Sequence, residues 1–101
     1  MKPMASRSSI EAALRHLAPS IPTHEFGAVV DHALDSAGLR TASPENAAWL
    51  SLVAYVRHRL TDYDAMLAEG YDKDSARAFV AGEMQAVLDS WGARRKLSAA
   101  E

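Results

Sequence analysis

Apolar side chains recur every three or four positions along most of this chain, the spacing that places them on one face of a helix. Four segments show the pattern, and proline, glycine and short polar stretches separate them: residues 8–17, 23–37, 44–69 and 72–91. No segment alternates apolar and polar residues as a half-buried strand does. The pattern therefore predicts an all-α fold, a compact bundle of about four helices.

Residues typical of helix ends flank these segments. Serine, threonine and aspartate accept hydrogen bonds from the first free N–H groups of a helix, and glycine tolerates the left-handed conformation that ends many helices. The expected N-terminal caps are Ser8, Thr23, Ser43 and Asp72, and the expected glycine stops are Gly38, Gly70 and Gly92. In the long third segment, Thr61 and Asp62 could also cap a new helix, so a break near Leu60 is an alternative to one continuous helix.

A chain of 101 residues is long enough to bury one core without disulfides or metals. We expect a single helical domain over residues 8–92 with flexible tails at 1–7 and 93–101, because neither end has apolar periodicity. Cysteine is absent, which excludes disulfides, thiol nucleophiles and thiolate zinc sites. No apolar run approaches the roughly 18 residues that cross a bilayer, and the N-terminus lacks the apolar core of a signal peptide. We therefore expect a cytoplasmic protein without a membrane partner.

The stretch from Tyr55 to Tyr71 holds the densest polar chemistry of the chain. On a continuous helix, His58 and Asp62 would project away from the apolar stripe, whereas Arg57 and Asp64 would lie along its flank. Together with one arginine of the last segment, this stretch supplies a candidate patch, functional or structural: Arg57, His58, Thr61, Asp62, Tyr63, Asp64 and Arg77.

Arg77 falls within the apolar arc of the last predicted helix. A half-buried charge there is costly unless it meets a carboxylate. We therefore predict that Arg77 pairs with Asp64 or Asp62 across the helix interface. The alternative is that its long side chain carries the charge out to solvent beside apolar neighbours.

His58 and Asp62 are four residues apart, so both could offer ligands to a metal ion or form an oriented base. A metal-assisted hydrolase that uses them is the second alternative function, although an ordinary surface pair explains the spacing as well. The glycines are scattered rather than clustered as in a phosphate-binding loop, and no nucleophile motif is present. We assign no catalytic residue, cofactor or metal ligand, and the sequence favours a protein that is not an enzyme.

A nucleic-acid-binding module is the first alternative function. The formal charge of -2 gives no general attraction to nucleic acid. A local basic patch could still form from Arg57, Arg59, Arg94, Arg95 and Lys96. The last three follow the final helix directly, where positive charge also complements the helix dipole.

Aromatic residues favour a protein partner or a homodimer instead. Trp49 and Trp91 lie near the ends of predicted helices, and with Tyr55 and Tyr71 they could belong to an interface, where aromatic residues and arginine are enriched. Packing in the core explains both tryptophans equally well. The leading interpretation is a non-enzymatic binding or protein-interaction module whose surface centres on the candidate patch.

The string R-H-R-L-T-D-Y-D-A-M-L at residues 57–67 resembles a family of small, uncharacterised helical domains, a domain of unknown function seen in bacteria and, in related form, in fungi. Residues 70–80 (G-Y-D-K-D-S-A-R-A-F-V) and 87–95 (V-L-D-S-W-G-A-R-R) are also similar to the bacterial form. The likeness covers roughly residues 10–95, and R-H-x-x-T-D-Y-D is its specific part. The resemblance implies no activity or ligand, but it directs attention to residues 57–64.

Overall fold

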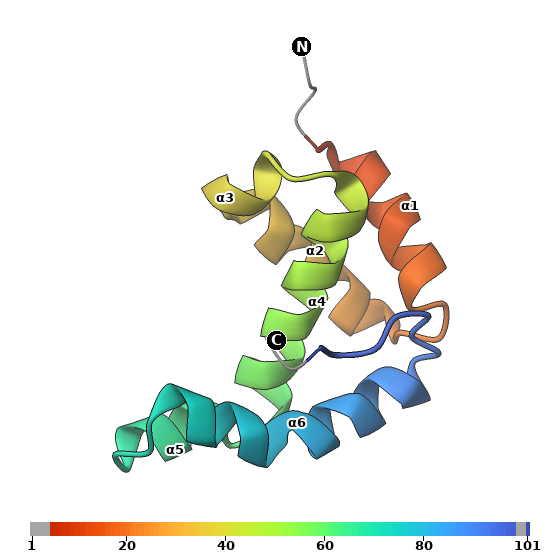
Figure 1. The fold of residues 1–101 in the computed structure, drawn as a ribbon. Helices are drawn as coiled ribbons and strands as arrows, with labels where there is room; N and C mark the ends of the chain where they lie inside the picture. The colour runs from red at the N-terminus through yellow and green to blue at the C-terminus, as the bar shows by residue number, and fades with distance from the viewer. Residues whose placement is uncertain (1–4, 99–100) are drawn as a thin grey trace.

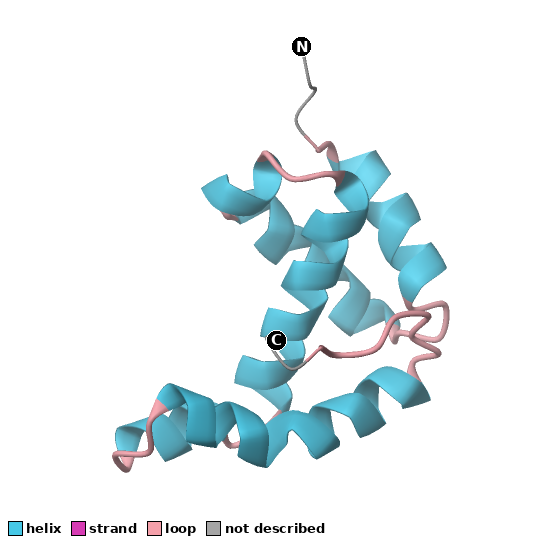
Figure 2. Cartoon of the chain, viewed as in Figure 1, coloured by secondary structure: helices cyan, strands magenta, loops and turns pink. Residues whose placement is uncertain are grey.

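The computed structural model describes residues 5–98 and 101, and the regular structure within them is entirely helical (Figure 2). The helices are α1 (Arg7–Leu17), α2 (Thr23–Asp35), α3 (Ala37–Arg40), α4 (Pro44–Leu60), α5 (Tyr63–Ala68) and α6 (Lys73–Ser90). The prediction of an all-α fold is confirmed, but the described residues form six helices rather than about four. The additional helices are α3, which replaces a predicted loop, and α5, which a break separates from α4.

Local hydrogen bonding explains the helix ends that were predicted correctly. Ser43 and Asp72 cap α4 and α6, and each accepts a hydrogen bond from the backbone N–H three residues further on, at 3.2 Å and 2.8 Å. Gly70 and Gly92 have φ angles of 103° and 72°, in the left-handed region that disfavours side chains. These four residues therefore end or begin helices where the sequence predicts.

Two predicted N-terminal caps are wrong. Ser6 rather than Ser8 caps α1, because Ser6 and Ser9 exchange hydrogen bonds in a capping box. Thr23 is the first residue of α2, and the cap position belongs to Pro22, which offers no side-chain acceptor. The first two helices thus begin one or two residues earlier than the capping pattern indicates.

The predicted glycine stop at Gly38 is also wrong. α2 ends at Asp35, and the hydroxyl of Ser36 accepts a hydrogen bond from the Leu39 N–H at 3.4 Å, which begins the new turn of α3. Gly38 lies inside that turn with ordinary helical geometry. The capping serine therefore restarts the helix before the glycine can end it.

The central helix of the fold is α4 (Figure 1). It contacts α1, α2 and α3, and α6 crosses its far end. Because neighbours surround it, α4 buries side chains on several sides, as an interior helix does. The buried residues of α4 are Ala47, Ala48, Trp49, Ser51, Leu52, Val53, Val56 and Arg57. Among the described residues, no helix is long and apolar enough to cross a membrane.

A fully buried hydroxyl joins α4 to α2. Ser51 Oγ donates a hydrogen bond to the Val29 carbonyl at 2.7 Å and lies 2.9 Å from His32 Nδ1. Since the single hydroxyl hydrogen of Ser51 points to Val29, His32 Nδ1 carries the proton and donates to Ser51. The buried polar group is therefore fully paired within the fold.

α5 and α6 pack on each other across the far end of α4, and the molecule measures 42 × 27 × 23 Å (Figure 1). After α6 the chain turns back toward α1 and α4. The Arg94 N–H donates to the Leu17 carbonyl, and the Ser20 N–H donates to the Trp91 carbonyl, both at 2.9 Å. We call residues 93–98 together with Glu101 the C-terminal segment.

The tails predicted at residues 1–7 and 93–101 lie partly outside the described residues, which exclude 1–4 and 99–100. The flexibility expected of these tails stays a prediction. The C-terminal segment is the described part of the second tail, and it forms hydrogen bonds with α1, α4 and α6.

Candidate functional site

The break between α4 and α5 falls at Thr61 and Asp62, so the T-D-Y-D segment forms a corner, which we define as residues 57–64. The Thr61 hydroxyl donates to the Arg57 carbonyl at the end of α4 and accepts from the Tyr63 N–H at 3.2 Å at the start of α5. One side chain thereby satisfies backbone groups of both helix ends. Asp62 is exposed and makes no capping bond.

Tyr63 fills the inside of the corner and is 2% exposed. Its ring centre lies 5.7 Å from the guanidinium carbon of Arg57 and 5.4 Å from the edge-on ring of His58. His58 Nδ1 lies 2.6 Å from Asp64 Oδ1, so the imidazole N–H donates to the carboxylate across the break. The contacts of His58, Thr61, Tyr63 and Asp64 therefore join the end of α4 to the start of α5.

Arg57 is the charged side chain that the corner buries, and it is 7% exposed. Nη2 donates to the main-chain carbonyl of Glu101, whereas Nε has no hydrogen-bond partner among the described residues. Burial lowers the pKa of the Arg57 guanidinium, and the positive charge of nearby Arg77 lowers this pKa further. The group nevertheless stays protonated, so the corner holds a buried charge.

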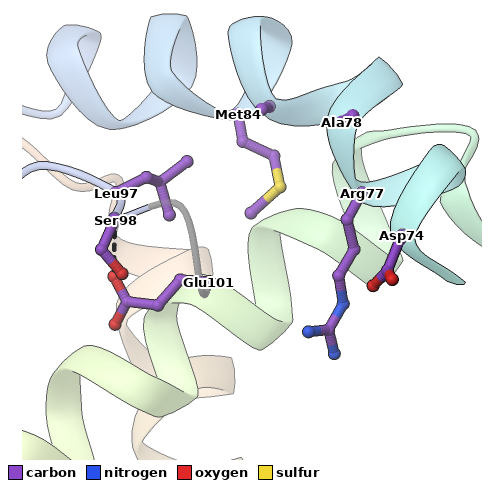
Figure 3. Close-up of a pocket in the computed structure, with 8 residues that line it drawn as sticks. Asp74, Arg77, Ala78, Met84, Leu97, Ser98 and Glu101 are labelled. Atoms are coloured by element: carbon purple, nitrogen blue, oxygen red, sulfur yellow. Dashed lines mark hydrogen bonds between the residues drawn. The ribbon is translucent and has the colours of Figure 1, made fainter.

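Arg77 extends from α6 toward α4 (Figure 3). Its Nε is also buried without a partner, and within the described chain no ion pair joins it to Asp62 or Asp64. The predicted pairing of Arg77 with either aspartate is therefore wrong, because the break turns Asp64 toward His58 and leaves Asp62 in solvent. The charge of Arg77 acts on the Arg57 guanidinium, and each of the two groups has an Nε–H donor without a partner in the described chain.

A cavity of about 510 Å³ opens beside Arg77, between α6 and the C-terminal segment. Its lining residues are Asp74, Arg77, Ala78, Ala81, Met84, Leu97, Ser98 and Glu101. Figure 3 shows Arg77 and Asp74 at one end and Glu101 at the other beside Leu97, with Met84 between the two ends. The cavity therefore combines an apolar middle with charged ends, as a site for a small polar group does.

Glu101 is held at the end of the cavity away from Arg77 (Figure 3). Its Oε2 accepts a hydrogen bond from Trp49 Nε1 at 2.6 Å and lies 3.8 Å from Arg95 Nη2, and its Oε1 accepts from the Ser98 N–H at 3.0 Å. Burial raises the pKa of this carboxyl, but the hydrogen bonds from Ser98 and Trp49 and the charge of Arg95 bring the pKa below its ordinary 4.5. The Glu101 carboxyl therefore makes these contacts in its ionised form.

His58 and Asp62 do not form the pair that was considered for a metal site or an oriented base, because His58 contacts Asp64 instead. In residues 5–98 and 101, no group of three or more histidine, aspartate or glutamate side chains is placed to hold a metal ion. The donor set of the corner therefore gives no support to a hydrolase.

The five basic residues considered for nucleic acid are not one open patch. Arg57 is buried, and Arg59 is exposed on α4. The other three have partners within the domain: Arg94 Nε donates to the His16 carbonyl at 2.8 Å, the Arg95 guanidinium lies 4.9 Å from the Trp49 ring centre, and Lys96 Nζ lies 3.5 Å from Asp89 Oδ1. Arg94, Arg95 and Lys96 therefore each have a partner within the domain, although all three side chains are exposed.

Sequence reasoning missed the contact between Trp49 and Glu101. A buried indole N–H needs an acceptor, and this requirement was the available signal. The acceptor lies 52 residues away, in a segment for which helical spacing predicts nothing. Spacing rules connect near neighbours only, so they could not identify Glu101.

Comparison with known proteins gives a family but no activity. No curated protein and no solved structure matches the chain. A family model described as an uncharacterized conserved protein (DUF2293) matches residues 13–92. The matched region contains the corner and Arg77, and it ends before the C-terminal segment. The chain therefore belongs to the family of uncharacterized conserved proteins DUF2293.

Proposed function

We propose that this domain is a non-enzymatic binding module that binds an anionic group of a partner protein in the cavity beside Arg77. The supporting observation is that the Nε–H donors of Arg57 and Arg77 are both buried without a hydrogen-bond partner among the described residues, and that the charge of Arg77 acts on the Arg57 guanidinium. Desolvated like charges destabilise a fold unless an opposite charge compensates them. A bound anion supplies that compensation.

The chemistry of arginine suits this role. A guanidinium presents N–H donors in a rigid, planar arrangement that matches a carboxylate or a phosphate. Arg77 lines the cavity, and Arg57 adds a second positive charge from α4. Since both groups are partly withdrawn from water, their attraction for an anion exceeds that of surface arginines.

A protein carboxylate fits the site better than a nucleic-acid backbone. The chain has a net charge of -2, and the Asp74 carboxylate stands at the edge of the cavity, so a line of phosphates meets repulsion. Arg94, Arg95 and Lys96 also have partners within the domain. An acidic segment of a partner protein brings a single carboxylate to the cavity, so it meets less of that repulsion than a line of phosphates does.

Thermal unfolding in the presence of single anions tests the proposal. The probes are N-acetylglutamate, inorganic phosphate and a short single-stranded oligonucleotide, each added to the wild-type chain, to Arg77→Gln and to the matched control Arg40→Gln. Arg40 is exposed on α3, far along the chain from the cavity. At ten times its Kd, a ligand raises the free energy of unfolding by about 1.4 kcal/mol, which is about 5–10 °C in Tm for a domain of this size.

We expect N-acetylglutamate to stabilise the wild-type chain and the Arg40 variant but not the Arg77 variant. Equal stabilisation of all three proteins, or of none, contradicts the proposal. Stabilisation by the oligonucleotide alone would favour the nucleic-acid alternative instead.

A further inference from the structure

The contacts of Glu101 indicate which kind of anion the site takes. The side-chain carboxylate of Glu101 meets Trp49, and the main-chain carbonyl of the same residue meets Arg57, so α4 receives two acceptors from one residue. A glutamate residue offers a side-chain carboxylate and a main-chain oxygen together, and a free phosphate or a nucleotide does not. The recognition pattern is therefore that of an acidic peptide.

The rest of the C-terminal segment also lies on the domain as a bound peptide lies on a receptor. The Arg94 N–H and Nε donate to the carbonyls of Leu17 and His16, and the Leu97 N–H donates to Gln85 Oε1 at 3.1 Å. Leu97 also lines the cavity. Main-chain hydrogen bonds with one apolar anchor and one acidic anchor are the means by which extended peptides bind to a surface.

We infer that the C-terminal segment is an internal pseudo-ligand, and that the ligand of the site is an acidic peptide segment of a partner protein that displaces Glu101 from α4. This inference rests on the proposed function, because it concerns the same cavity. Within the described chain, Glu101 makes no ion pair with Arg77. A partner carboxylate that reaches Arg77 therefore makes a contact that the internal ligand leaves unused.

Tethering sets the strength of this competition. The C-terminal segment follows α6 directly, and a short tether holds a ligand at an effective concentration of about millimolar. The apparent affinity for an external peptide falls by the fraction of molecules in which the site is free. The internal ligand therefore raises the concentration of external acidic ligand that half-saturates the wild-type site, but it does not abolish binding.

The test is isothermal titration of the full chain with the peptide LSAAE, the sequence of residues 97–101, acetylated and amidated to remove its terminal charges. Glu101→Lys places a positive charge beside Arg57 and Arg95 and releases the internal ligand. Glu83→Lys makes the same charge change on the exposed face of α6 and is the matched control. We expect LSAAE to bind the Glu101 variant at least about tenfold more tightly than the wild-type chain or the control.

Two further measurements make the test independent of one variant. The peptide LSAAQ should bind the Glu101 variant at least about tenfold more weakly than LSAAE, because it lacks the carboxylate charge that Trp49 and Arg95 meet in the wild-type chain. The indole N–H resonance of Trp49 should shift in Glu101→Lys and return toward its wild-type position when LSAAE saturates the protein. The isosteric Glu101→Gln gives the same comparison if the lysine variant does not fold.

Equal affinity of LSAAE for the wild-type chain and the Glu101 variant contradicts the claim that the C-terminal segment occupies the site. Equal affinity of the Glu101 variant for LSAAE and LSAAQ contradicts the claim that the ligand is acidic. In both cases, stabilisation by N-acetylglutamate that depends on Arg77 would leave the proposed function standing. Loss of that stabilisation as well would contradict both the pseudo-ligand and the proposed function.

Discussion

Two polar side chains that α4 buries have opposite surroundings. Ser51 is fully buried, and α2 satisfies its hydroxyl through Val29 and His32. Arg57, further along the same helix, is 7% exposed, and it has an unused Nε–H and a second guanidinium as its neighbour. The polar group of Ser51 is therefore fully paired, whereas the guanidinium of Arg57 keeps one donor without a partner among the described residues.

This comparison teaches that burial of a polar group does not by itself distinguish structure from function. Most buried polar groups in proteins are hydrogen-bonded, so an unpaired group calls for a specific explanation. Ser51 follows the general rule and stabilises the fold. Arg57 departs from this rule and contacts Glu101, which lines the cavity, so Arg57 is a candidate for binding.

Replacement of Ser51 should have the largest effect on stability. We expect Ser51→Ala to lower the free energy of unfolding by about 1–2 kcal/mol, because the buried hydrogen bonds to Val29 and His32 are lost. Urea unfolding measures this difference, with Ser20→Ala on the surface as the control, which should stay within about 0.5 kcal/mol of the wild type. A Ser51 variant as stable as the control would mean that the two regions do not differ.

Replacement of Arg57 should act in the other direction. We expect Arg57→Met to leave the free energy of unfolding unchanged or to raise it by up to about 1 kcal/mol, because an apolar side chain of similar length removes a buried, unpaired charge. The same variant should lose stabilisation by N-acetylglutamate. Arg59→Met, on the exposed side of α4, is the control for the loss of a charge. A strong destabilisation by Arg57→Met would give Arg57 the structural role of Ser51.

A fall in pH should release the Glu101 carboxyl from Trp49. Its effect on the free energy of unfolding should be smaller than the effects of replacing Ser51 or Arg57. The folded state lowers the pKa of the Glu101 carboxyl below 4.5, so its contribution is complete above that pH and is lost as the pH falls through the lower, folded-state value. The Trp49 indole resonance should therefore titrate below pH 4.5 in the wild-type chain. In Glu101→Gln this titration should be absent, and its persistence there would assign the transition to another carboxyl group.

The sequence predicts the helices well where a local bond decides their ends. Ser43 and Asp72 cap helices in the structure because the hydrogen bonds that they accept lie within one turn. The break after Leu60 could not be settled in the same way, since Tyr63 and Leu67 continue the apolar spacing whether or not the helix continues. The two hydrogen bonds of Thr61 decide between these alternatives.

The sequence indicates where the candidate patch lies, but it does not predict which side chains contact one another there. The density of charge around Arg57 identifies the corner from sequence alone. On a continuous helix, however, His58 and Asp64 project in different directions, so their contact exists only because the helix breaks. Glu101 was beyond reach for a related reason, because only the folded chain brings it to Trp49.

The backbone bonds that join Leu17 to Arg94 and Ser20 to Trp91 also bear on the order of assembly. α1, α2 and α4 are near neighbours in sequence, so their contacts can form early, while a chain emerging from the ribosome still lacks α6. The two bonds close a loop that spans almost the whole domain, and the entropy cost of closing it delays them. We therefore expect the C-terminal segment to reach α1 in the last step of folding, after the helices have packed on one another.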